Sequence, residues 1–162
     1  MTWRLYGSLP NGVKPFATAT AGQRFVELDE ALHSQEAGPL WLKEARIAQL
    51  VQDAFLYGEE VLRLYDLEAW VIFANHVHLL IRPHVELARI TRVLKSYTAN
   101  RANQLLGRRG RPLWQIGSFD RVRSAAEFEK IVRYIENNPL KAGLVTRPEE
   151  WKWSSAGRKK QA

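Results

Sequence analysis

Apolar residues recur every three or four positions in four segments of the chain, and this spacing predicts amphipathic helices there. The segments span residues 23–34, 41–57, 87–106 and 125–137. Pro139 follows the last segment, and a proline at this point stops a helix because it has no N–H to donate.

Bulky and β-branched residues gather in four shorter segments bounded by turn-forming residues, which predicts strands at 3–9, 62–73, 76–82 and 113–122. The short break at Ala74-Asn75 predicts that the two middle strands form a hairpin. The order of strand, helices, hairpin, helix, strand and helix matches an α+β fold. We therefore expect a ferredoxin-like antiparallel sheet, in the split β-α-β arrangement, with helices packed on it.

The composition agrees with one domain that has a proper core, because 46% of the 162 residues are hydrophobic. We expect this domain to span residues 1–162, with a short basic tail from about residue 156. The chain has no cysteine, which excludes a disulfide framework and a zinc-thiolate site. It shows neither a signal peptide nor an apolar run of membrane-spanning length, so we expect a soluble, cytoplasmic protein.

The net charge of +7 comes from one segment of the chain. No acidic residue occurs between Leu87 and Phe119, and outside the basic residues of this segment the chain has 17 acidic and 17 basic residues. The segment's basic residues are Arg89, Arg92, Lys95, Arg101, Arg108, Arg109 and Arg111. Such a block attracts a polyanion, most commonly nucleic acid. A solvated helix face, a phosphate-rich metabolite or an acidic protein partner would also fit it.

Two of the four histidines, His76 and His78, lie one residue apart in an apolar segment. Residues two apart in a strand point to the same face, so both imidazoles would project side by side, where they can share one cation. Packing alone is a poor explanation, although it remains an alternative, because each buried imidazole needs a hydrogen-bond partner. The pair therefore predicts a metal site.

Tyr134 and Asn138 are four residues apart at the end of the last predicted helix, so they share a helical face. A tyrosine can attack a phosphodiester and hold the product as a covalent phosphotyrosine. A divalent cation held by two imidazoles and one side-chain oxygen would polarise the phosphate and keep positions open for its oxygens. Considered alone, however, Tyr134 is an ordinary core or surface residue and Asn138 an ordinary helix stop.

Several motifs resemble single-strand tyrosine transposases, and in particular their REP-associated branch. The first motif is Asn75-His76-Val77-His78, followed by Leu79-Leu80-Ile81. Those downstream are Leu113-Trp114-Gln115, Phe119-Asp120-Arg121 and Tyr134-Ile135-Glu136-Asn137-Asn138-Pro139-Leu140-Lys141-Ala142-Gly143-Leu144. The resemblance extends from about Trp3 to Ser155 and is least secure between Asn11 and Trp41.

This resemblance implies the His-hydrophobic-His transposase fold, with a C-terminal helix that carries the nucleophile Tyr134. His76, His78 and Asn138 would be the metal ligands, and the cofactor would be Mg²⁺ or Mn²⁺. The family cuts and rejoins single-stranded DNA beside palindromic hairpins, so the expected partner is hairpin DNA. Relatives include monomers and homodimers, and the protein would be associated with the nucleoid.

The mechanism that we predict begins with DNA held by the basic segment, whose phosphate contacts set the register. Trp114 would stack on bases of the single strand, although most tryptophans are core residues. Tyr134 would then attack, leaving a 5′-phosphotyrosine and a free 3′-hydroxyl. Two alternatives are a ferredoxin-like module that only binds nucleic acid, and a metal-dependent nuclease that activates water.

Overall fold

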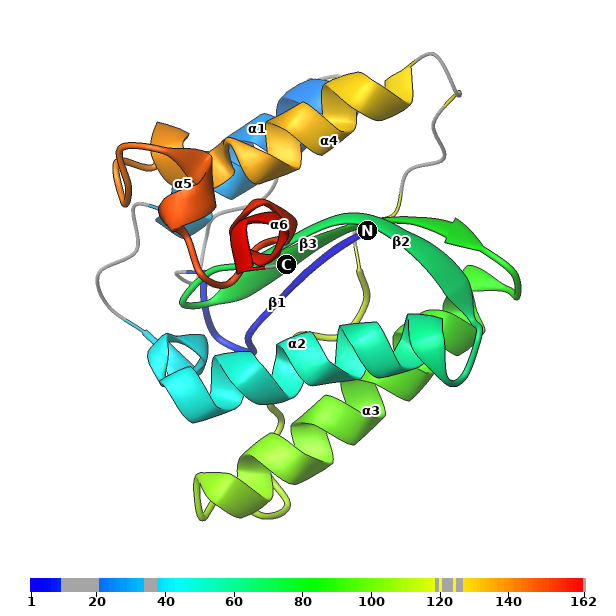
Figure 1. Ribbon diagram of the computed structural model, residues 1–162. Coiled ribbons are helices and arrows are strands. Elements are labelled where there is room, and N and C mark those ends of the chain that lie inside the picture. The colour runs from blue at the N-terminus through cyan, green and yellow to red at the C-terminus, as the bar shows by residue number, and fades with distance from the viewer. Residues whose placement is uncertain (10–20, 34–37, 119, 121–123, 125–126, 162) are drawn as a thin grey trace.

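The computed structural model describes residues 1–9, 21–33, 38–118, 120, 124 and 127–161, which form three strands and several helices (Figure 1). In chain order the elements are β1 (Thr2–Arg4), α1 (Ala21–His33), η1 (Trp41–Lys43), α2 (Ala45–Glu60), β2 (Tyr65–Ile72), β3 (His76–Pro83), α3 (Leu87–Leu105), α4 (Phe128–Glu136), α5 (Asn138–Lys141), η3 (Pro148–Glu150) and α6 (Ser155–Gln161). Among these residues, no helix is both long and apolar enough to span a membrane.

The strands form an antiparallel sheet in the order β1-β3-β2, with β2 and β3 joined as the predicted hairpin. The predicted strand 113–122 is wrong in its extent. Within its described residues, 113–118 and 120, pairing is limited to a bridge between Leu5 and Trp114. Hydrogen bonds from Tyr6 N to Leu113 O and from Gln115 N to Arg4 O, both 2.8 Å, support this bridge. This bridge lies beside β1, where a ferredoxin-like sheet has its fourth strand. The predicted α+β fold is therefore confirmed, with a sheet of three strands and a bridge in the place of the fourth.

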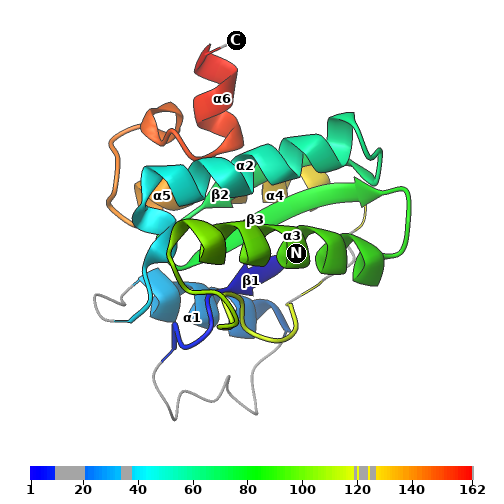
Figure 2. The same cartoon turned by 90° about the horizontal axis from the view of Figure 1, so that it is seen from below.

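Helices cover both faces of the sheet (Figure 1). Helices α2 and α3 lie on one face, and in Figure 2 they stand in front of the sheet with α4 behind it. Val77, Leu79 and Ile81 of β3 belong to the core on the α2 and α3 side. Leu80 belongs to a smaller core that also holds Ile135 of α4. Because side chains alternate along a strand, His76 and His78 share the face of Leu80, on the side of α4.

The C-terminal part of the chain differs from the predictions in two respects. Helix α4 is described from Phe128, and the predicted start at Ala125 lies outside the described residues. The Ser124 hydroxyl donates to the Glu127 carboxylate at 3.2 Å. Residues 119, 121–123 and 125–126 lie outside the described residues. The predicted basic tail is helical as α6, where Ser155 Oγ accepts from Trp70 N of β2 at 3.2 Å. Helix α4 is therefore followed by further helices and is not the last one.

Candidate active site

The two histidines of β3 lie side by side in the interior. His76 is 0% exposed and His78 is 1% exposed, and their ring centroids are 4.9 Å apart. Phe73 stacks on the His76 ring with a centroid distance of 4.7 Å. The structure thus places both imidazoles on one face of the strand, as their spacing predicts.

Each imidazole is oriented through its Nδ1 atom. Asn75 Nδ2 donates to Leu32 O at 2.9 Å, so Asn75 Oδ1 faces His76 Nδ1, at 2.7 Å, and accepts its proton. Thr2 Oγ1 of β1 lies 2.7 Å from His78 Nδ1. Such partners on one ring nitrogen fix the orientation and tautomer of a histidine whose other nitrogen binds a metal. The Nε2 atoms of both rings point to a common centre.

This centre is the carboxylate of Asp29, on α1, which the sequence did not single out. Its Oδ1 lies 3.2 Å from His76 Nε2 and 2.8 Å from His78 Nε2. Its Oδ2 accepts from the Tyr134 hydroxyl at 2.8 Å and from Asn138 Nδ2 at 2.9 Å. The four site residues predicted from the sequence therefore meet around one carboxylate that is only 4% exposed.

Burial and the Asp29 charge set the protonation of these groups. Burial lowers the pKa of His76 to about 3, which keeps this imidazole neutral near pH 7. Burial opposes ionisation of Asp29, but His78 outweighs it and holds the pKa of Asp29 well below its usual range. Burial, followed by the Asp29 charge, raises the pKa of Tyr134 above its ordinary value. The phenol therefore carries its proton and donates to the carboxylate.

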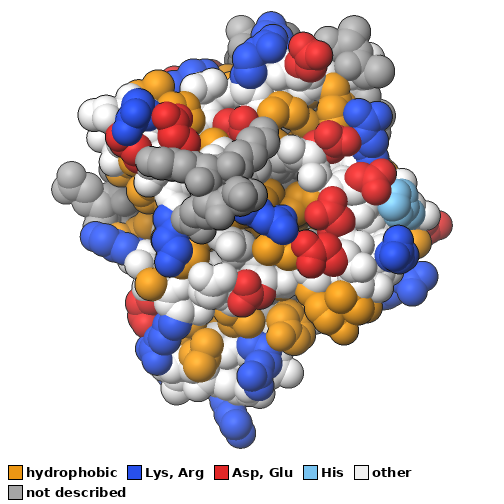
Figure 3. Space-filling view, in the orientation of Figure 1, with side chains coloured by type: hydrophobic (Ala, Val, Ile, Leu, Met, Phe, Trp, Pro, Cys, Tyr) orange, Lys and Arg blue, Asp and Glu red, His pale blue; other side chains and the backbone are white. Residues whose placement is uncertain are grey.

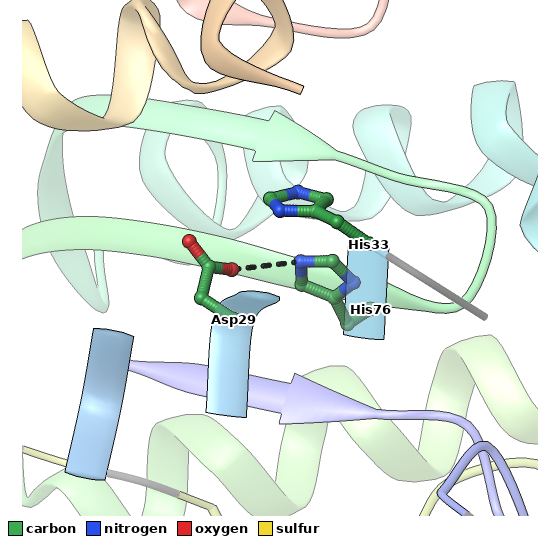
Figure 4. Close-up of side chains that lie close together, drawn as sticks. All are labelled: Asp29, His33 and His76. Carbon is green, nitrogen blue, oxygen red and sulfur yellow. Dashed lines mark hydrogen bonds and ion pairs between the residues drawn. The ribbon is translucent and has the colours of Figure 1, made fainter. Parts of the chain in front are cut away.

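His33 lies one helical turn beyond Asp29 on α1 and faces the same centre (Figure 4). Its ring centroid is 5.1 Å from that of His76, and its Nε2 is buried without a hydrogen-bond partner among the described residues. Ligand atoms of Asp29, His33 and His76 all lie within 4.8 Å of one another. One feature of the sequence could have indicated Asp29, because this charged residue stands between Leu28 and Leu32 on the apolar face of an amphipathic helix.

The structure does not bring the basic segment to this centre, because α3 covers the opposite face of the sheet (Figure 1). Arg89, Arg92, Arg101, Arg109 and Arg111 are exposed. Two further cations of the segment have intramolecular contacts. Lys95 Nζ donates to Gln115 O at 2.6 Å and Gly117 O at 2.7 Å, and the Arg108 guanidinium lies 4.4 Å from the centre of the Trp41 ring.

Trp114 is buried, at 6% exposure, so this structure does not present its ring for the predicted stacking on bases. Its Nε1 donates to Thr98 Oγ1 at 2.8 Å, and its ring packs edge-on against Trp3 at 6.2 Å. A flat apolar ring with a satisfied N–H is more stable in the core than in water, and that preference decides its position.

Comparison with known proteins agrees with this fold. Residues 60–138 match the family described as "Transposase IS200 like". A solved structure of a REP-associated tyrosine transposase bound to a REP hairpin is similar, with a TM-score of 0.61 and 18% sequence identity. The similarity covers 97% of this chain and 74% of that chain. No curated protein matches the chain.

The matched segment contains His76, His78, Tyr134 and Asn138, the four residues that meet at Asp29. A little under half of the chain is thus similar to IS200-like transposases, and the fold is similar to that of a REP-associated tyrosine transposase.

Proposed function

We propose that this protein cuts and rejoins single-stranded DNA at palindromic hairpins through a covalent 5′-phosphotyrosine on Tyr134. One observation carries the proposal. The Tyr134 hydroxyl and the Nε2 atoms of His76 and His78 all contact the carboxylate of Asp29, which joins a nucleophile to a pair of metal-ligand atoms. The IS200-like family match supports the reaction class, DNA transposition.

The donor set fits a divalent cation, Mg²⁺ or Mn²⁺. His76 is neutral, its Nδ1 is held by Asn75, and its Nε2 points to a carboxylate, which is how a metal-binding histidine is prepared. His76 and His78 would hold the ion, and Asn138 is the third ligand that the resemblance implies. When bound, such an ion polarises a phosphate and neutralises charge that develops on its oxygens.

Tyr134 would carry out the covalent step. Its oxygen forms a bond to the scissile phosphorus and loses its proton, while the bond from phosphorus to the 3′ oxygen breaks and that oxygen takes up a proton. The products are a 5′-phosphotyrosine and a free 3′-hydroxyl. Attack by a 3′-hydroxyl reverses these changes and rejoins the strand. The hydrogen bond to Asp29 holds the phenol at the centre before attack.

The exposed arginines of α3 and of the loop after it would hold the DNA. They lie along the lower part of the molecule in Figure 3, where Lys and Arg side chains, in blue, project from α3. They stand apart from the His-Tyr centre, so we assign them to phosphate contacts along the hairpin and not to the scissile bond. A protein that binds DNA in this way would be associated with the nucleoid. The structural neighbour, bound to a REP hairpin, supports hairpin DNA as the partner.

A protein–DNA adduct that survives denaturation tests the proposal directly. The protein is incubated with labelled hairpin DNA and Mn²⁺ and then separated under denaturing conditions. We expect an adduct for the natural protein, none for Tyr134→Phe, and an unchanged amount for Tyr57→Phe, which alters an exposed tyrosine of α2.

Two outcomes would contradict the proposal. If Tyr134→Phe still cuts at most of the natural rate, the protein is a nuclease that activates water. If the natural protein binds several hairpins with metal present but cuts none, it is a nucleic-acid-binding module.

A further inference from the structure

Asp29 Oδ1 and His76 Nε2 are both hydrogen-bond acceptors, although they lie 3.2 Å apart in the interior. The proton of the His76 ring is on Nδ1, where it is donated to Asn75 Oδ1, so Nε2 presents a lone pair. The carboxylate oxygen also presents lone pairs. Two acceptors this close repel each other unless a cation lies between them, and a second proton would place a charge on a ring that is 0% exposed.

His33 shows the same need for a cation. Its Nε2 is buried and no described part of the chain offers it a hydrogen-bond partner, which is costly for a polar atom. It comes from the same helix as Asp29, one turn further along, and the two side chains approach the sheet together (Figure 4). A nitrogen and an oxygen from α1 thus point to the histidines of β3.

The distances suit shared ligation. Two atoms bound to one divalent ion at about 2.0–2.2 Å lie roughly 2.8 to 4.4 Å apart. Asp29 Oδ1 lies 3.2 Å from His76 Nε2 and 2.8 Å from His78 Nε2, and the ligand atoms of Asp29, His33 and His76 lie within 4.8 Å of one another. Small side-chain shifts would place Asp29 and the three histidines, His33, His76 and His78, around one ion.

Asn138 is less well placed to be the oxygen ligand. As oriented here, its Nδ2 donates to Asp29 Oδ2 at 2.9 Å and so turns a donor to the centre, whereas a cation needs the amide oxygen. Tyr134 also donates to Oδ2, and Oδ1 is the oxygen that faces the histidines. Asn138 therefore orients the carboxylate.

We propose that α1 completes the cation site of this protein, with Asp29 as its oxygen ligand and His33 as a third imidazole beside His76 and His78. The role of this site in DNA cutting depends on the function proposed above, but the binding of the ion does not. Nitrogen donors favour transition-metal ions over Mg²⁺. The site should therefore bind Mn²⁺ at least about tenfold more tightly than Mg²⁺.

Titration of the DNA-free protein with Mn²⁺, followed by electron paramagnetic resonance with Mg²⁺ as competitor, tests this assignment. We expect Asp29→Asn, which keeps the shape and removes the charge, to weaken Mn²⁺ binding at least about tenfold. Glu30→Gln removes an equal charge from the adjacent, exposed residue of α1 and should change the Mn²⁺ affinity less than about twofold. Asn138→Ala should stay within about threefold, because it removes only a partner of Asp29.

The electron spin echo modulation of bound Mn²⁺ gives a second readout. This signal would not change on substitution of His33 if His33 had a purely structural role. His33→Gln should remove the nitrogen couplings of one imidazole and leave those of two. This spectrum of the natural protein remains decisive if Asp29→Asn fails to fold, as judged by circular dichroism.

The assignment is overturned if Asp29→Asn binds Mn²⁺ as the natural protein does, if Asn138→Ala loses as much affinity as Asp29→Asn, or if bound Mn²⁺ shows only two imidazoles. None of these results would affect the adduct on Tyr134, so failure of this inference is separable from failure of the proposed function. If Mn²⁺ binds as expected but no adduct forms, the proposed function fails and this inference stands.

Discussion

The Tyr134 hydroxyl donates to Asp29 Oδ2 at 2.8 Å and so joins α4 to α1 across 105 positions of the chain. The same carboxylate contacts both histidines of β3. The proposed nucleophile and the proposed metal ligands thus come from one copy of the protein. A single chain can form the whole site, whatever its oligomeric state.

A mixing experiment tests whether the site acts within one chain. Tyr134→Phe lacks the nucleophile and His76→Ala lacks a metal ligand, so neither variant should form the DNA adduct. We expect an equimolar mixture to remain inactive, because every chain in it has an incomplete site. Adduct formation on hairpin DNA is the measurement. Recovery of adduct in the mixture would show that Tyr134 of one chain acts at the histidines of another.

Trp114 should matter for stability and not for base stacking. Trp114→Ala removes a buried ring that packs on Trp3, and we expect it to lower the free energy of unfolding by about 3–5 kcal/mol. Urea denaturation measures this loss. Ile116→Ala, two residues away at 91% exposure, should cost less than about 0.5 kcal/mol. A similar small loss at Trp114 would mean that its ring is not part of the core.

The salt dependence of DNA binding should report the exposed arginines. Arg109→Gln removes one exposed charge beside α3, and we expect the slope of log K against log salt to become less steep by about 0.9. Fluorescence anisotropy with hairpin DNA over a range of salt concentrations gives this slope. Arg46→Gln, on α2, removes an equal charge that is paired with Glu44 at 2.8 Å. Equal changes in slope for both variants would assign DNA binding to net charge and not to this segment.

Glu150 should contribute a pH-dependent part of stability. Hydrogen bonds from Thr146, and then from Arg147, lower the pKa of its carboxyl to about 2. Because the folded-state pKa is depressed, this stabilisation is present above the ordinary pKa of about 4.5 and is lost as the pH falls from there towards 2.

Thermal unfolding of the natural protein and of Glu150→Gln between pH 2 and 6 tests this expectation. The difference in Tm should be largest above about pH 4.5 and shrink towards pH 2. Glu129→Gln, at an exposed carboxylate paired with Arg133 at 3.7 Å, is the control and should show a smaller difference. A difference for Glu150→Gln that does not change with pH would contradict the assigned cause.

The sequence by itself determined the features that depend on local periodicity. Alternation along β3 places His76 and His78 on one face because successive strand residues point to opposite sides. Helical spacing predicts α1, α2 and α3. Such relations need no knowledge of the rest of the molecule. Helical spacing does not predict that Tyr134 lies in α4 and Asn138 begins a separate helix, α5.

Only the tertiary structure decided which distant residues meet. Asp29 and His33 reach the histidines because α1 packs on the same side of the sheet as α4, and no local pattern determines that packing. Trp114 is buried because its ring packs on Trp3 of β1 and its N–H donates to Thr98 of α3, residues that lie far from it in the chain. Long-range contacts are chosen by the burial of whole faces, and a linear pattern does not contain that information.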